Sequence, residues 1–137
     1  GFIRVKNFRK VLISPNGFAA AALASTSCAE CPAGKKGYNG ITASTAEICA
    51  DCAAGSISSA VQSTSCTICP KGTYVQQAAQ TLCSDCVAGR FLADDGSDIA
   101  QHNHVDDCQS CPVGTFNTDA KSSSCSVCPR GKYADVP

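Results

Sequence analysis

The chain has 137 residues and no net charge at pH 7, and Val, Ile, Leu and Phe together supply only 25 residues, about 18%. This composition argues against one ordinary hydrophobic core and predicts several small units that need covalent cross-links. The balanced charge does not suggest a nucleic-acid partner, and no stretch approaches the ~18 consecutive apolar residues of a membrane span.

The first 27 residues lack cysteine and are expected to form two segments. Residues 1–13 are predicted to be one strand-like lead-in. Residues 14–27 are interpreted as a degenerate repeat, in which Ser14 stands where later copies have cysteine and Gly17 keeps the glycine position. A targeting peptide over residues 1–24 is the alternative, although Ser14-Pro15-Asn16-Gly17 interrupts the apolar run that it requires.

From Cys28 onward the chain is a series of Cys-x-x-Cys pairs, and no cysteine stands outside a pair. Successive pairs are separated by steps of 21, 17, 17, 25 and 17 residues. A basic step of 17 with two insertions indicates an internal repeat. The six pairs are Cys28/Cys31, Cys49/Cys52, Cys66/Cys69, Cys83/Cys86, Cys108/Cys111 and Cys125/Cys128.

Each second cysteine is followed three residues later by glycine, and four of the six are followed directly by proline. The order Cys69-Pro70-Lys71-Gly72 matches a type I β-turn with proline at its second position and glycine at its fourth. A short extended segment follows, so each unit is expected to be a small hairpin. The six predicted turn glycines are Gly34, Gly55, Gly72, Gly89, Gly114 and Gly131.

Four copies also carry an aromatic residue five positions after the second cysteine. These side chains are expected to lie over the adjacent disulfide and to supply most of the apolar cover of each unit. They are Tyr74, Phe91, Phe116 and Tyr133.

The expected fold is therefore a small disulfide-rich protein, mostly β and irregular with little helix. It is an elongated tandem array of short β-hairpin modules, each contacting only its neighbours in sequence. The predicted units after the degenerate repeat are a first cysteine-rich module at 28–52, a connecting loop at 53–65, a second module at 66–86, an acidic and histidine-containing insertion at 87–107, a third module at 108–128 and the start of a further repeat at 129–137.

Three chemistries compete for the cysteine pairs. Structural disulfides are favoured by the even count and the small units. A zinc site with four thiolates fits the spacing of Cys66, Cys69, Cys83 and Cys86 taken alone. Redox catalysis is disfavoured, because the turn motif does not place a thiol at a helix N-terminus.

Two disulfide schemes remain open, since spacing does not fix connectivity. The ladder scheme joins the second cysteine of one pair to the first of the next, as in Cys69–Cys83, and leaves Cys28 and Cys128 without partners. The modular scheme uses all twelve cysteines and is favoured, because proline follows the second cysteine in the loops inside its modules. Its bonds are Cys28–Cys49, Cys31–Cys52, Cys66–Cys83, Cys69–Cys86, Cys108–Cys125 and Cys111–Cys128.

Apart from the cysteines, the candidate ligand groups lie in the insertion. Asp94, Asp95 and Asp98 are weak candidates for calcium, although their spacing does not fit an EF-hand, and a solvated acidic loop is the favoured interpretation. His102 and His104 are expected to be surface histidines rather than metal ligands or a pH switch. No catalytic constellation and no cofactor are predicted.

The motif Cys-x-x-Cys-Pro-x-Gly-Thr-[Tyr/Phe], with serine- and threonine-rich returns to the next pair, resembles the ephrin-receptor-like (GCC2/GCC3) cysteine-rich repeat. It is similar more distantly to EGF-like and tumour-necrosis-factor-receptor modules. The resemblance covers Cys28 to Tyr133. It implies an extracellular, rod-like array of small β modules without catalytic residues.

The predicted function is a non-enzymatic extracellular structural protein, a disulfide-cross-linked rod segment of a filament, coat or adhesive surface protein. Its expected partners are copies of itself or a co-assembling surface protein, and the serine and threonine runs are compatible with O-linked glycans. The alternatives are a receptor ectodomain stalk or ligand-binding region and, with low weight, an intracellular zinc-ribbon array.

Overall fold

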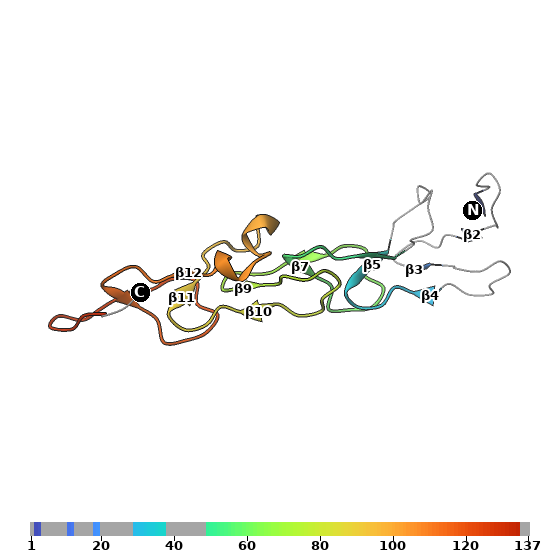
Figure 1. Cartoon of the computed structure of the whole chain (residues 1–137). Coiled ribbons are helices and arrows are strands. Elements are labelled where there is room, and N and C mark those ends of the chain that lie inside the picture. The colour runs from blue at the N-terminus through green and yellow to red at the C-terminus, as the bar shows by residue number, and fades with distance from the viewer. Residues whose placement is uncertain (1, 4–10, 13–17, 20–28, 38–48, 135–137) are drawn as a thin grey trace.

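The computed structural model describes residues 2–3, 11–12, 18–19, 29–37 and 49–134. The chain forms an elongated rod, along whose long axis the sequence progresses from one end toward the other (Figure 1). Short antiparallel hairpins and disulfides make up this rod, which confirms the predicted fold class. No helix in the described part is long and apolar enough to cross a membrane.

In the described residues, consecutive strands pair two by two into seven separate sheets, so β1 pairs with β2, β3 with β4, and so on to β13 with β14. Two single-turn 3₁₀ helices, η1 (Ile99–Gln101) and η2 (Val105–Asp107), project from one side of the rod. The strands are β1 (Phe2–Ile3), β2 (Val11–Leu12), β3 (Phe18–Ala19), β4 (Ala29–Glu30), β5 (Lys35–Gly37), β6 (Cys49–Asp51), β7 (Ser56–Ile57), β8 (Thr67–Ile68), β9 (Thr73–Tyr74), β10 (Ser84–Asp85), β11 (Arg90–Phe91), β12 (Gln109–Ser110), β13 (Thr115–Phe116) and β14 (Ser126–Val127).

The lead-in is not one strand, because β1 pairs antiparallel with β2. In the degenerate repeat, Phe18 pairs with Glu30, and Thr115 pairs in the same register with Val127. Counted from Ser14 and Cys111, Phe18 and Thr115 occupy the same position of the repeat. The remainder of residues 14–27, including Ser14 itself, lies outside the described residues.

The predicted turns are present, but their register is shifted by one residue. In the Cys69 copy the amide of Thr73 donates to the carbonyl oxygen of Pro70 at 3.1 Å, so proline occupies the first turn position and glycine the third. Gly72 has φ +75°, the left-handed conformation that the third position of a type II turn requires. The same bond and a positive glycine φ recur in all six copies, so type II replaces the predicted type I.

The ladder scheme is the one that forms, and the favoured modular scheme is wrong. The five bonds are Cys31–Cys49, Cys52–Cys66, Cys69–Cys83, Cys86–Cys108 and Cys111–Cys125. Cys128 is free, and Cys28 lies outside the described residues. None of the predicted bonds is present: not Cys28–Cys49, Cys31–Cys52, Cys66–Cys83, Cys69–Cys86, Cys108–Cys125 or Cys111–Cys128.

Strand geometry explains this pairing. Most pairs enclose a two-residue strand, as Cys66 and Cys69 enclose β8. Residues three apart in an extended segment point to opposite faces. Cys66 therefore bonds backward to Cys52, whereas Cys69 bonds forward to Cys83. Because these sulfurs are in disulfides rather than present as thiolates, the same bonds overturn the zinc-ribbon alternative.

The interior is built largely from sulfur and from residues on either side of the aromatic position. In the Cys69 copy, Thr73 and Val75 are buried, and Tyr74 between them points the other way because strand side chains alternate. Tyr74 packs on Cys86, Cys108 and Leu92, a cluster in the next copy rather than at its own disulfide. The buried apolar residues of the described chain are Cys31, Cys52, Cys69, Val75, Cys86, Leu92, Cys108 and Cys111.

Tyr74 thus covers the disulfide of the next copy instead of its own, and the predicted aromatic cover is wrong for Phe116 and Tyr133. Tyr74 and Phe91 are half-buried, whereas Phe116 is exposed and Tyr133 has 81% of its surface accessible. Because the side chain at this position points away from the interior of its own copy, its burial depends on which residues lie beside it.

Candidate functional site

Consecutive copies are joined by a repeated set of backbone hydrogen bonds. We name each copy by its second cysteine. Between the Cys69 and Cys86 copies, the Gly72 amide donates to the Leu92 carbonyl at 2.9 Å, and the Cys86 amide donates back to the Gly72 carbonyl at 2.8 Å. The second bond recurs at every junction between described copies, from Cys52–Gly34 to Cys128–Gly114. The turn glycine is therefore a connector as well as a turn residue.

A second set of bonds runs from three of the loops to the preceding copy. It uses three non-glycine residues with left-handed φ of 60° to 63°, namely Gln62, Ala79 and Lys121. Their amides donate at 2.8–2.9 Å to the carbonyl oxygens of Cys31, Cys52 and Cys86 respectively. Because this backbone conformation is rare outside glycine, its recurrence at one repeat position shows that the junction imposes it.

The copies also touch their second neighbours, so the expectation of contact in sequence order alone is wrong. A Cβ placed on Gly34 would lie 2.3 Å from the Ala79 carbonyl oxygen, two copies further along, and one on Gly72 would lie 2.3 Å from that of Lys121. The corresponding position at Gly55 meets Ile99. The Cys31, Cys52 and Cys69 copies therefore each contact the next two copies along the rod, whereas a Cβ on Gly89 or Gly114 would meet nothing within 4 Å.

One junction uses a side chain where the others use backbone. The Gly89 amide donates to the Asn117 side-chain oxygen at 2.6 Å, and the Asn117 amide group donates to the Arg90 carbonyl at 2.9 Å. At the same repeat position, Leu92 and Val75 accept through their backbone carbonyls. At the junction of the Cys86 and Cys111 copies, the Asn117 side chain therefore takes the place of this one backbone acceptor.

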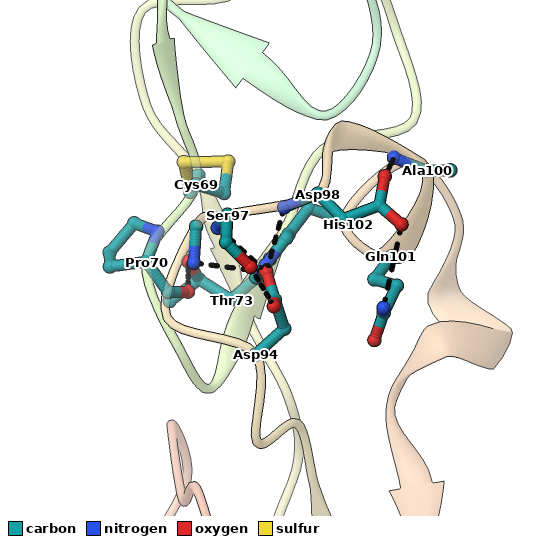
Figure 2. Close-up of polar contacts among 11 residues, drawn as sticks. Cys69, Pro70, Thr73, Asp94, Ser97, Asp98, Ala100, Gln101 and His102 are labelled. Carbon is teal, nitrogen blue, oxygen red and sulfur yellow. Dashed lines mark hydrogen bonds and ion pairs between the residues drawn. A yellow bond between two sulfur atoms is a disulfide. The ribbon is translucent and has the colours of Figure 1, made fainter.

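The long insertion is organised by the Asp94 carboxylate (Figure 2). It accepts the backbone amides of Gly96, Ser97 and Asp98 at 2.9–3.1 Å and the Ser97 hydroxyl. These bonds, the Ser97 hydroxyl first, hold the pKa of Asp94 well below its ordinary range. The resulting loop lies against the Cys69 turn, since a Cβ on Gly96 would stand 3.1 Å from the Cys69 carbonyl oxygen.

His102 closes this loop onto the preceding copy, and its predicted surface position is wrong. Its side chain is fully buried. Nδ1 lies 2.7 Å from the Thr73 carbonyl oxygen, and Nε2 lies 3.0 Å from the Asp94 carboxylate (Figure 2). The His102 carbonyl oxygen also accepts the Val75 amide at 2.8 Å. His102 thus holds two parts of the insertion together and also binds the insertion to β9 and Val75.

The other groups of the insertion act locally. Asp98 caps η1 through the Ala100 amide, and His104, which is exposed, caps η2 through the Asp106 amide. The Asp94, Asp95 and Asp98 carboxylates do not form a ligand cluster; in the described chain no group of three or more His, Cys, Asp or Glu residues could hold a metal ion. Asp94 is occupied by its own loop instead.

A shallow cavity of about 290 Å³ lies beside Tyr74, over the Cys86–Cys108 disulfide. Its other lining residues are Asp85, Val87, Arg90, Val105 and Asp106. The insertion forms part of this cavity, because η2 contributes Val105 and Asp106 to its wall.

Sequence reasoning missed the Asp94–His102 pair and the inward positions on either side of the aromatic residue. A signal for the latter was available, because Val75 and Leu92 stand at the same place after their cysteines. No comparable signal marks His102, whose burial follows from the fold of an insertion that has no counterpart in the other copies.

The chain was compared with known proteins. Residues 55–102 and 99–137 match the family model described as tyrosine-protein kinase ephrin type A/B receptor-like, and together they cover more than half of the chain. No curated protein matches the chain. Disulfide-rich modules of this kind indicate an extracellular or secreted domain. The resemblance seen in the sequence is confirmed, and the chain belongs to the ephrin-receptor-like cysteine-rich repeat family.

Proposed function

We propose that the chain is a non-enzymatic structural rod of the extracellular surface, a segment of a filament, coat or adhesive protein that associates with copies of itself or with a co-assembling surface protein. The overlapped junctions carry this proposal. Each junction from the Cys31 copy to the Cys111 copy combines a backbone connection through the turn glycine with a disulfide on either side. Such a construction supports length and stiffness.

The second-neighbour contacts are the specific argument for a spacer. A chain of units that touch only adjacent units can bend at every joint. Here a bend between the Cys69 and Cys86 copies would also separate Gly72 from Lys121 in the Cys111 copy. The joints from the Cys31 copy to the Cys111 copy are therefore restrained by contacts that bypass them.

Exposed apolar side chains support association with other protein chains. Val113 and Val127 both belong to the Cys111 copy, and 82% and 78% of their surfaces are accessible. Leu82 and Val87 are further exposed residues of this kind. We assign these exposed apolar side chains to contact with other protein chains.

The test is the assembly state of the oxidised chain. Sedimentation velocity and negative-stain electron microscopy over a wide concentration range should show rods that join into longer or wider particles. The double variant Val113→Ser, Val127→Ser should weaken the association. The matched control is Val61→Ser, which removes one exposed valine from another copy.

A rod that stays monomeric throughout would overturn the assembly proposal. That outcome would favour the receptor stalk instead, because a stalk needs the length and not the self-association. A compact or flexible particle in place of a stiff rod would contradict both.

A further inference from the structure

The ring of His102 faces two hydrogen-bond acceptors. The Thr73 carbonyl oxygen is 2.7 Å from Nδ1, and the Asp94 carboxylate is 3.0 Å from Nε2. A carbonyl oxygen and an ionised carboxylate have no proton to donate. A neutral imidazole has one N–H and one lone pair, so it satisfies only one of these partners, whereas the imidazolium donates to both.

Asp94 does not supply the missing proton. Four donors from its own loop hold the carboxylate ionised, and they hold the pKa of Asp94 well below its ordinary range. Loss of a proton from His102 would therefore leave two acceptors facing each other in a buried site, which is costly because water cannot replace the lost donor.

We propose that His102 is a proton-operated lock, which as the imidazolium clamps the insertion onto β9 and, on losing a proton to solvent, releases it. The lock acts on the junction between the Cys69 and Cys86 copies, because the His102 backbone also accepts the Val75 amide. The stiffness of the rod at this one joint then depends on pH.

The surroundings of His102 are acidic. Residues 91–107 contain five aspartates and no lysine or arginine, and negative charge nearby favours the charged ring. The acidic and neutral titratable groups on the segments around His102, besides Asp94, are Asp95, Asp98, His104, Asp106 and Asp107 on the insertion, Tyr74 on β9 and Asp85 on the strand opposite Thr73. The basic groups are Lys71 in the preceding turn, Arg90 on β11 and Lys121, whose backbone lies against Gly72.

Three other described copies make the equivalent connection without a titratable residue. The amides of Gly37, Ser58 and Leu92 donate to the carbonyls of Ser63, Gln80 and Ser122. The amide of Leu92 is therefore an internal control for that of Val75, since both occupy the same repeat position.

The direct test is NMR of the intact, oxidised chain at about pH 7.5, with ¹⁵N–¹H correlations through two bonds to read the protonation of each ring nitrogen. We expect both nitrogens of His102 to carry protons. A His102 ring with one unprotonated nitrogen at this pH, or at about pH 5.5, would overturn the proposal.

The functional test is amide hydrogen exchange between about pH 5 and pH 9, corrected for intrinsic base catalysis. Protection of the Val75 amide should fall at least about tenfold relative to that of Leu92 as His102 loses its proton, because a hydrogen bond from a charged donor contributes more than a neutral one. Parallel behaviour of the two amides would contradict the lock. His102→Gln should abolish the pH-dependent difference, and His104→Gln should leave it intact.

Discussion

Gly72 and Lys121 are held so close together that a methyl group on the glycine would stand 2.3 Å from the lysine carbonyl oxygen. The two residues belong to copies that are not adjacent along the rod. The contact gives position 72 a second requirement for glycine, in addition to that of the turn.

We expect Gly72→Ala to destabilise the chain much more than Gly114→Ala. Both glycines have left-handed φ, +75° and +82°, so both substitutions carry the penalty of that conformation, about 1–2 kcal/mol. Only Gly72 also meets a backbone atom, whereas nothing lies within 4 Å of a Cβ on Gly114. Thermal unfolding followed by circular dichroism measures the difference, and equal losses in the two variants would contradict the second-neighbour contact.

The disulfide ladder predicts a specific peptide map. Digestion of the non-reduced chain should yield Cys69 linked to Cys83, and never to Cys86. Replacing both Cys69 and Cys83 by alanine should lower the free energy of unfolding by up to about 3 kcal/mol, the chain-entropy value for a loop of this size.

The control for the peptide map is Cys128→Ser, which removes the free thiol and should leave stability unchanged. Recovery of Cys66 linked to Cys83 would restore the modular scheme and refute the ladder.

The threonine after the turn glycine should contribute more to the free energy of unfolding where it is buried. The Thr73 and Thr115 hydroxyls both donate at 2.6 Å to the carbonyl of the turn proline, Pro70 and Pro112 respectively. Thr73 is buried and Thr115 is not. Thr73→Val should therefore lower the free energy of unfolding by about 1 kcal/mol. Thr115→Val should lower it less, and urea titration of the two variants compares them.

Acid stability should depend on Asp94. Because its pKa is lowered on folding, its contribution is complete above the ordinary aspartate value near ~3.9 and is lost as pH falls toward the lower value of the folded chain. Asp94→Asn should be less stable than the wild type at pH 5 and should lose less on further acidification. Melting temperatures measured from about pH 5 to pH 2 test this, with the exposed Asp95→Asn as the control.

The repeat architecture could be predicted from spacing because local rules fix it. Glycine at one position and cysteines three apart are enough to specify a turn and a short strand. The disulfide partners could not be chosen in the same way. The partners depend on which face of a two-residue strand each cysteine occupies. Cys66 and Cys69 lie on opposite faces and bond in opposite directions along the chain. The modular scheme, which the sequence favours because it uses all the cysteines, would have both bond in the same direction.

The contents of the insertion were less predictable. Asp94 and His102 are eight residues apart in a loop whose path is set by tertiary contacts with Cys69 and β9. A histidine in a polar stretch is ordinarily at the surface, and only the fold shows that this one is enclosed.

The ladder of disulfides also determines how the rod would carry tension. A load passing along the chain crosses from Cys69 to Cys83 through the sulfur bridge, whose Cα atoms are 5.9 Å apart, and bypasses the loop between them. Reduction of that one bridge would release roughly 45 Å of stored chain, while the other bridges continue to shield their own loops. The molecule would therefore lengthen in separate steps, because each disulfide holds back the length of one loop until that disulfide is reduced.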